Sequence, residues 1–231
     1  MQFSDLLTNR VRADGARPLI TSYAANGDRT ELSATTFANW VDKTANLLVD
    51  TLGLDPGEPV AVRLARSHPG HWMTLVWHAA IWRAGLLVDL VEPGSAAVEV
   101  LGPQDQPSAS AADHLACSLH PFGMGFSTPL AAGVIDWAAE VKGEPDLFAG
   151  TPPADGDPAW QEVQIRRTYA QLVGVDPIDY RILLTPADPW AAVAGGLLGP
   201  LLGGGSAVVM PVGTDAARVA EIGRTERAEA R

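Results

Sequence analysis

Apolar segments of two kinds alternate along the first hundred residues, and this alternation constrains the fold more than any other feature. After Ser33, which we expect to be a helix N-cap, apolar residues recur at the spacing of one helix face: Phe37, Val41, Ala45, Leu48 and Leu52. Residues 59–65 (PVAVRLA) and 86–91 (LLVDLV) are short apolar runs typical of buried strands. Helices alternating with such strands predict an α/β fold, a sheet of mostly parallel strands flanked by helices.

A tight turn is predicted near the start of the chain. The dipeptide Asn26-Gly27 separates the segment Arg17–Tyr23 from Asp28–Leu32. Such a turn needs positive φ at both central positions, which Asn and Gly tolerate. We therefore expect an N-terminal antiparallel hairpin beside the parallel strands.

A second helix follows the strand at 59–65. Ser67 or His68 is expected to cap it, with Pro69 in its first turn, and Gly85 is expected to end it. The next strand then ends in Pro93-Gly94, a turn signal.

The C-terminal third repeats the alternation of helix and strand. Arg181–Leu184 reads as a strand, Pro189–Leu202 as an apolar helix, Ser206–Met210 as another strand and Ala216–Arg231 as a charged helix. We expect the strands at 59–65, 86–91, 181–184 and 206–210 to share or abut one sheet.

Two segments rich in turn-forming residues bear on the domain organisation. Residues 102–113 (GPQDQPSASAAD) are expected to be an exposed loop, and residues 143–158 are rich in Pro and acidic residues. With 47% hydrophobic residues, the chain can bury one large core. The expectation is one α/β domain, 1–231, which the hinge 143–158 divides at most into two lobes, 1–142 and 159–231.

Charge and cysteine content argue against several classes of partner. The net charge of −11 disfavours nucleic acid and anionic membranes, which need a basic surface. A single cysteine, Cys117, excludes an internal disulfide and a multi-thiolate metal site. The first residues lack a basic segment followed by an apolar run, so the expected location is the cytoplasm.

The longest uncharged stretch is predicted to be buried rather than membrane-spanning. Trp190–Met210 has 21 residues without a charge, which is long enough to cross a bilayer. It contains six glycines and Pro200, however, and no basic residues flank it. A buried helix, turn and strand is the favoured interpretation.

The common nucleotide and nucleophile motifs are missing. A phosphate-binding loop needs G-x-x-x-x-G-K-[ST], but neither Lys43 nor Lys142 stands in one. The glycines of 123–125 (GMG) begin a dinucleotide fingerprint that fails at Thr128. A serine elbow, G-x-S-x-G, fails in the same segment because Pro129 replaces its last glycine.

The histidines and the cysteine do not form a recognisable site in the sequence. His71, Thr74 and His78 share one stripe of the second helix, but about 10 Å along the axis separates the two imidazoles, a poor spacing for one metal. Structural histidines are therefore favoured. Cys117, near His120, lies in an apolar stretch and is expected to be an inert core thiol. We predict no catalytic residue and no metal ligand, and the sequence leaves cofactor-binding residues unknown.

The order of the predicted hairpin, helices, turns and strands resembles the N-terminal part of the adenylate-forming (AMP-binding, acyl-CoA synthetase) superfamily. The matching residues are Thr30–Leu32, Asn46–Leu48, Gly53–Val62, Arg83–Val88, Tyr180–Leu184 and Gly195–Met210. The compact length and the segments NWVDKTANLL and LAAGVIDWAAEV resemble more closely a small family of uncharacterised bacterial proteins distantly similar to those enzymes. The resemblance implies a truncated version of the N-terminal domain of such an enzyme.

Departures from the superfamily pattern bear on activity. Its phosphate loop, T-S-G-T-T-G-x-P-K-G, is expected between the hinge and Arg181. That interval here is DPAWQEVQIRRTYAQLVGVDPID, with no lysine and no glycine-rich loop. The later Y-G-x-T-E motif and the lid with the adenylation lysine have no counterpart before the sequence ends. Because adenylation needs these groups to stabilise charge on the α-phosphate, the resemblance transfers no catalytic residue.

Three hypotheses follow for function. The favoured one is a non-catalytic relative, a pseudoenzyme, that acts as a binding or scaffolding module and needs no cofactor. The second is an acyl-adenylating or nucleotide-binding enzyme with a non-standard site, and only this one calls for ATP, AMP or CoA. The third is an unrelated small α/β enzyme, which would show a deep pocket with clustered titratable groups.

The C-terminal lobe is the predicted contact surface. The apolar segment 189–210 needs a cover, and the charged helix 216–231 offers mainly Val219 and Ile222 for it. We therefore expect a homodimer or protein partner interface there, with no nucleic acid and no membrane as partner.

Overall fold

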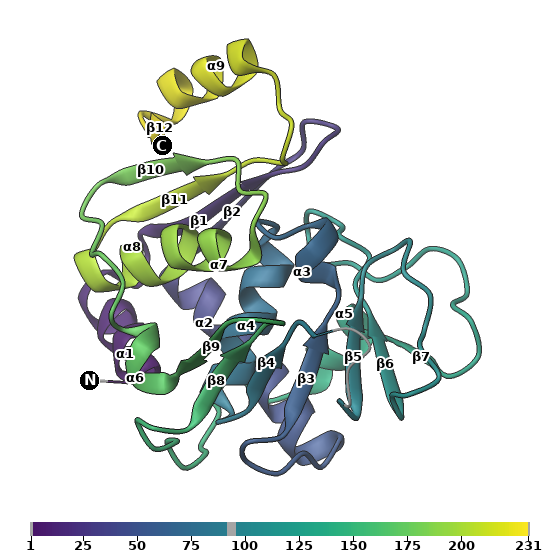
Figure 1. Ribbon diagram of the computed structural model, residues 1–231. Helices are drawn as coiled ribbons and strands as arrows, with labels where there is room; N and C mark the ends of the chain where they lie inside the picture. The colour runs from purple at the N-terminus through teal and green to yellow at the C-terminus, as the bar shows by residue number, and fades with distance from the viewer. Residues whose placement is uncertain (1, 92–95, 231) are drawn as a thin grey trace.

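The computed structural model describes residues 2–91 and 96–230 of the 231-residue chain. In this part the chain forms two sheets with helices between and beside them (Figure 1). This is the α/β class predicted from the sequence. The predicted hairpin is present as well, since β1 (Pro18–Tyr23) pairs antiparallel with β2 (Arg29–Ser33). Gly27 has the expected positive φ of +90°, whereas Asn26 does not have a positive φ, so the expectation for that position is wrong. The expected strand end at Pro93-Gly94 lies outside the described residues.

The five-stranded sheet has the order β12-β10-β11-β1-β2 in the described part of the chain. Its other strands are β10 (Arg181–Leu184), β11 (Ser206–Val209) and β12 (Glu229–Ala230). Every neighbouring pair is parallel except β1 with β2. Ala207 lies opposite both Ile20 and Ile182, so residues from both ends of the sequence meet in the middle of this sheet.

The seven-stranded sheet has the order β7-β6-β5-β3-β4-β8-β9 within the same described residues. Its strands are β3 (Pro59–Val62), β4 (Leu87–Asp89), β5 (Val98–Leu101), β6 (Asp113–Ala116), β7 (Val134–Asp136), β8 (Pro158–Gln161) and β9 (Arg166–Thr168). All pairs are parallel except β8 with β9. The four strands predicted from the sequence are thus divided between two sheets.

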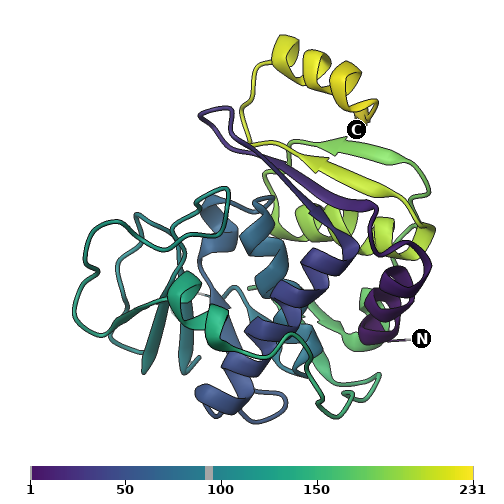
Figure 2. The same cartoon turned by 180° about the vertical axis from the view of Figure 1, so that it is seen from behind.

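Helices lie between the two sheets and on both faces of the five-stranded sheet (Figures 1 and 2). They are α1 (Phe3–Asp14), α2 (Ala34–Asn46), α3 (Leu64–Ser67), α4 (Trp72–Arg83), α5 (Trp137–Glu140), α6 (Tyr169–Leu172), α7 (Pro189–Val193), α8 (Gly199–Gly203) and α9 (Ala216–Glu226), with a 3₁₀ turn at Val141–Gly143 and π turns at Leu47–Thr51 and Ala194–Leu198. Helices α7 and α8 lie on one face of the five-stranded sheet and α9 lies on the other (Figures 1 and 2).

Helix α4 lies at the centre of the core, packed against α2. Trp72, Trp77 and Trp82 project from different sides of it, and each is at most 1% exposed. A helix that is apolar all round needs neighbours on every side. Its position between the two sheets supplies them.

The two predicted helix starts have different outcomes. Ser33 caps α2 as expected, because its Oγ accepts a hydrogen bond from the backbone N–H of Thr36 at 3.1 Å. The expected cap of the next helix at Ser67 or His68 is wrong. Residues 64 and 65, predicted as the end of the strand 59–65, belong to the short helix α3, and α4 begins at Trp72 with His71 as its N-cap.

The chain on either side of segment 143–158 contributes to both sheets. Strand β8 follows the segment and pairs with β4, whereas β11 pairs with β1. Residues 144–157 have no regular helix or strand. The division into one domain or two lobes stays a prediction.

The uncharged segment 190–210 has the helix, turn and strand predicted for it. It passes through α7, a π turn and α8, reverses at Gly204 with φ +84°, and enters β11. Most of its side chains are buried within the chain itself, although Ala191 is exposed. Among the described residues, no helix has the length and apolar character to cross a membrane.

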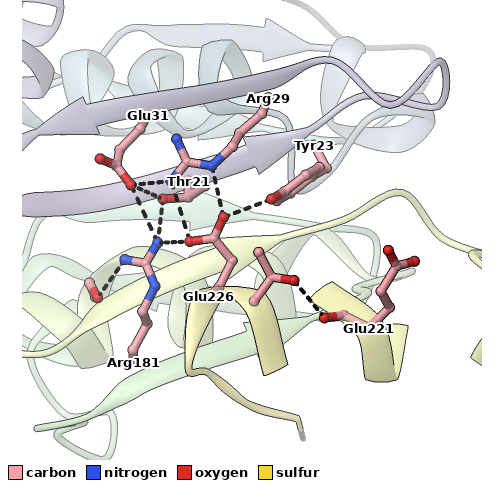
Figure 3. A network of polar contacts seen from close by, with 9 residues as sticks. Thr21, Tyr23, Arg29, Glu31, Arg181, Glu221 and Glu226 are labelled. Atoms are coloured by element: carbon pink, nitrogen blue, oxygen red, sulfur yellow. Dashed lines mark hydrogen bonds and ion pairs between the residues drawn. The ribbon is translucent and has the colours of Figure 1, made fainter. Parts of the chain in front are cut away.

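The C-terminal helix covers more than its sequence predicted. It ends at Glu226 rather than at the terminus, and it packs Ile222 against Leu183, Val208 and Met210 on the outer face of the five-stranded sheet. The carboxylate of Glu226 holds its C-terminal end against the hairpin strands and β10 (Figure 3). The charged residue Glu226 therefore attaches the helix to the sheet through its hydrogen bonds and ion pairs.

Candidate functional site

A cavity of about 260 Å³ lies where the two sheets approach each other. One wall is formed by the carboxyl ends of β1 and β11, and the other by the turn 67–71 before α4. Leu119 and Pro186 complete the lining. In open sheets with parallel strands, ligands bind outside the carboxyl ends of the strands. This position makes the cavity the candidate binding site.

Close packing of a glycine shapes the wall between the turn and the sheet. A Cβ atom on Gly70 would lie 2.2 Å from Cγ1 of Val209 and 3.0 Å from Cγ of Pro186. Only glycine lets the turn approach the end of β11 this closely. The turn and its two histidines are thus held directly against the five-stranded sheet.

His71 is held as a neutral imidazole. Its Nδ1 accepts a hydrogen bond from the backbone N–H of Met73 at 3.2 Å, so a neutral ring carries its proton on Nε2. Burial and, to a smaller extent, the nearby His68 lower the pKa of His71 to about 3, although a backbone hydrogen bond at Leu119 acts in the opposite direction. The ring is therefore uncharged at neutral pH, and both of its nitrogens interact with the backbone, one with Met73 and the other with Leu119.

His68 and Ser67 form the second polar group of the cavity. Ser67 Oγ lies 2.9 Å from Nδ1 of His68. Desolvation lowers the pKa of His68, while the charge of Asp105 acts in the opposite direction. Thr74 holds the turn 67–71 in place, because its Oγ1 donates a hydrogen bond to the backbone carbonyl of His68 at 2.7 Å.

The Ser67–His68 contact resembles part of a nucleophile–base pair but lacks its third member. A catalytic imidazole is oriented by a group that bonds its other nitrogen. In the described part of the chain, no carboxylate makes a hydrogen bond to His68, and Asp105 Oδ2 instead accepts from the backbone N–H of Gly102 at 2.7 Å. The arrangement is suited to binding through hydrogen bonds and offers little for acyl transfer.

Leu119 contributes a wall in an unusual backbone conformation. Its φ is +61°, a region that a leucine rarely occupies. Its side chain packs against the core while the residue lines the cavity. Backbone strain of this kind persists where the surrounding structure fixes it, and it concentrates at functional sites.

The two histidines of the predicted helix stripe, His71 and His78, lie in different surroundings. His71 lines the cavity, whereas His78 is fully buried beside Trp82 and Trp160, and neither of its ring nitrogens has a hydrogen-bond partner among the described residues. The two histidines of the stripe therefore do not share a site. Within residues 2–91 and 96–230, no cluster of His, Cys, Asp and Glu has the arrangement of a metal site.

Cys117 is a buried thiol, as the sequence predicted. Its Sγ accepts a hydrogen bond from Nε1 of Trp77 at 3.1 Å, and burial raises its pKa to about 12. His120, which the sequence places near it, instead accepts a hydrogen bond from the backbone N–H of Phe122 through Nδ1 at 3.1 Å. The thiol and the imidazole do not form a nucleophilic pair.

Sequence reasoning missed the cavity residues that precede α4. Ser67 and His68 were expected to cap a helix, and Gly70 was not singled out. A usable signal was present, because two histidines flank a Pro-Gly dipeptide between apolar segments, and such dipeptides mark turns.

The interval expected to hold a phosphate loop folds as an ordinary hairpin. Strands β8 and β9 are joined by residues 162–165, Glu-Val-Gln-Ile. The N–H of Glu162 donates to the carbonyl of Ile165 at 2.7 Å, and the carboxylate of Glu162 accepts from Nε1 of Trp160, also at 2.7 Å. The turn thus contains a carboxylate, no glycine and no lysine.

Comparison with solved structures identifies the fold as that of part of an acyl-CoA synthetase. The Brucella canis acyl-CoA synthetase superimposes with a TM-score of 0.76 at 15% sequence identity. The alignment covers 99% of this chain and 46% of that enzyme. The resemblance to the N-terminal part of adenylate-forming enzymes, predicted from sequence, is therefore confirmed for the fold.

Among curated proteins, the chain is similar to one from Mycobacterium tuberculosis (strain ATCC 25618 / H37Rv) described as "TIGR03089 family protein". The two are 38% identical over 145 residues, which cover 59% of this chain and 58% of that protein. The chain thus matches little more than half the length of this relative. No family model matches the sequence.

Proposed function

We propose that this chain is a non-catalytic binding module, built on half of an acyl-CoA synthetase fold, that takes a small uncharged ligand into the cavity. The observation that carries the proposal is the β8–β9 hairpin. Phosphate loops bind anions through free backbone N–H groups and a lysine. The turn 162–165 has neither glycine nor lysine, and the N–H of Glu162 is already bonded within the turn.

The cations that follow the turn do not replace the missing lysine. Arg167 places its guanidinium 4.0 Å from the centroid of the Trp190 ring, a cation–π contact that holds it against α7. Within the turn itself, Glu162 places a carboxylate where a phosphate loop offers a lysine.

The cavity supports binding of a neutral molecule. Val209, Met210 and Pro186 give it apolar walls, and the imidazoles of His68 and His71 have lowered pKa values. A ligand that enters meets no fixed charge but finds the hydrogen-bonding edge of His68 at one side. Cavities of this kind bind small molecules by apolar contact and use a few polar groups to orient them.

Binding is tested with indole and benzyl alcohol as neutral probes, and with ATP, AMP and CoA in parallel. A ligand of the native state raises the unfolding temperature with increasing concentration. We expect stabilisation by a neutral probe, with changes in the amide signals of Gly70 and Met210 in NMR spectra, and no change in these two signals with the nucleotides.

A cavity-filling variant and a matched control localise the effect. Ala24→Leu adds a large side chain at the cavity lining and should abolish stabilisation by the neutral probe, whereas Ala170→Leu makes the same change at an exposed position of α6 and should retain it. Stabilisation by ATP or CoA that Ala24→Leu abolishes, or equal effects of the two variants on the neutral probe, would contradict the proposal.

An interface through the C-terminal lobe remains a proposal of its own. Trp190 and Leu202 are only half-buried at the surface of the segment 190–210. They support association, although most of the segment is covered by the chain itself. Light scattering at micromolar concentration tests it, since a strict monomer without a copurifying protein would contradict it.

A further inference from the structure

A second pocket, about 240 Å³ in volume, lies at the amino ends of β1, β10 and β11 in the five-stranded sheet. The cavity of the proposed function lies at the opposite, carboxyl ends of β1 and β11. We call the second pocket the arginine pocket. Its lining includes Arg10, Arg17, Asp179, Arg181, Gly205 and Ser206. Arg17 pairs with Asp14, and Arg181 pairs with Glu31 and Glu226, so Arg10 is the arginine of this lining whose charge has no acidic partner among the described residues.

Arg10 is a buried charge without an acidic partner. It is 7% exposed, and in the described part of the chain no carboxylate forms an ion pair with it. Two hydrogen bonds are made, from Nη1 to the carbonyl of Gly204 at 2.6 Å and from Nη2 to that of Gly205 at 3.0 Å. A guanidinium has five N–H donors, so three of them, including the buried Nε, find no acceptor among these residues.

A buried arginine without an acidic partner lowers the stability of the folded chain unless another group supplies negative charge. Buried arginines are normally paired, because the desolvated cation is otherwise uncompensated. The backbone carbonyls of Gly204 and Gly205, which follow α8, offset part of the charge of Arg10, since the carbonyl end of a helix carries partial negative charge. An anion in the pocket would offset the rest.

Ser206 adds a neutral donor beside Arg10. Its Oγ accepts a hydrogen bond from Nη1 of Arg181 at 3.2 Å. The hydroxyl hydrogen is therefore free to donate, and the guanidinium that bonds the oxygen strengthens it as a donor. Arg181 itself is held in place by Glu226 at 2.6 Å.

Arg17 lies at the mouth of the pocket and can move. Its side chain is 72% exposed, and its only ion pair among the described residues is with Asp14 at 3.5 Å. An exposed pair of this length contributes little to stability. Arg17 can therefore leave Asp14 and close over a bound anion at small cost.

We infer that the arginine pocket binds a tetrahedral oxyanion, a phosphate or sulfate group. Donors reach it from α1, from the segment before β1 and from β11, so they surround a ligand with several oxygens better than a planar carboxylate. Arginine matches such oxygens with more than one N–H at a time. This site is separate from the cavity of the proposed function and does not depend on it.

Calorimetry with inorganic phosphate, sulfate and acetate tests the inference, with sodium chloride keeping the ionic strength constant. We expect saturable one-to-one binding of phosphate and sulfate but not of acetate. The amide signals of Gly205 and Ser206 should move with the phosphate titration in NMR spectra.

Variants identify the residues responsible. Arg17→Gln and Ser206→Ala each remove one donor and should weaken phosphate binding about tenfold or more, the usual loss for a hydrogen bond to a charged group. Arg12→Gln removes the same charge from an exposed position of α1 that does not line the pocket, and this variant should bind phosphate normally. Arg17 and Ser206 are preferred to Arg10, whose replacement would also disturb α8.

Three results would overturn the inference. They are the absence of saturable phosphate binding, equal binding of acetate, and equal weakening by Arg12→Gln and Arg17→Gln. The last result would mean that the affinity for phosphate depends only on the net charge of the protein and not on the arginine pocket.

Discussion

Nη2 of Arg181 on β10 lies 2.6 Å from Oε2 of Glu226 at the end of α9, and this contact joins the C-terminal helix to the five-stranded sheet (Figure 3). Glu226 also accepts hydrogen bonds from Nε of Arg29 and the hydroxyl of Tyr23, both at 2.7 Å. One carboxylate that is 8% exposed thus holds α9 to three strands.

Replacing Glu226 should loosen the helix. Glu226→Gln removes the charge that three donors share, and we expect a loss of roughly 1–3 kcal/mol in the free energy of unfolding. Glu221→Gln is the matched control on the same helix, because that side chain is 56% exposed and pairs only with Arg218 among the described residues. Urea unfolding of both variants measures the difference, and equal stability of the two would contradict this account.

The same carboxylate predicts a pH dependence. The hydrogen bond from Arg29 is the largest cause that lowers the pKa of Glu226, to about 2 from its usual 4.5, although burial acts in the opposite direction. A lowered pKa means that the stabilisation is fully present above pH 4.5 and is lost as the pH falls toward 2. Wild type should therefore lose more stability than Glu226→Gln between pH 5 and 3.

His78 predicts a second pH dependence that begins at higher pH. Burial lowers its pKa from 6.5 to about 3, so the unfolded chain binds a proton more readily than the folded one. Stability then falls with decreasing pH below 6.5, by about 1.4 kcal/mol for each pH unit. Because neither ring nitrogen has a hydrogen-bond partner in the described part of the chain, His78→Leu should keep or raise stability at pH 7.5 and lose less of it at pH 5. Greater acid sensitivity of the variant would contradict the prediction.

Packing at the cavity wall predicts a steric effect. Gly70→Ala brings a Cβ within 2.2 Å of Val209 and should cost roughly 1–3 kcal/mol in the free energy of unfolding. Gly143→Ala introduces the same group where nothing lies within 4 Å, and it should be close to neutral. Thermal unfolding of the pair measures the difference; a harmless Gly70→Ala would mean that the turn is not pressed against β11.

The elements that the sequence predicted are those with strong local signals. The turn at Gly27 and the cap at Ser33 are set by neighbouring residues, and so are the strand Arg181–Leu184 and the reversal at Gly204. The class of fold follows from these local signals, because alternating helices and strands leave few ways to bury their apolar faces.

The division into two sheets could not be predicted in the same way. Whether β11 pairs with β1 or with β3 depends on contacts between residues almost two hundred positions apart, which no local pattern encodes. The strand β5 (Val98–Leu101) and the helix α1 were likewise missed, because their short apolar patterns have no clear boundary signals.

The candidate site was less predictable than the fold. His71 was noticed as one of two histidines on a helix stripe, but its role as the N-cap beside a cavity depends on where the helix begins. The arginine pocket brings Arg10 to Gly205 across the whole sequence. Sites assembled from distant segments need the tertiary structure before they can be recognised.

The most direct test of the central claim is ATP–pyrophosphate exchange with the purified chain and a panel of carboxylic acids, with an active acyl-CoA synthetase as the positive control. The account predicts exchange no greater than background for every acid, because the β8–β9 turn offers no cradle for the phosphates. Exchange above background that depends on the acid would show that the chain adenylates and would contradict the claim that it is a binding module.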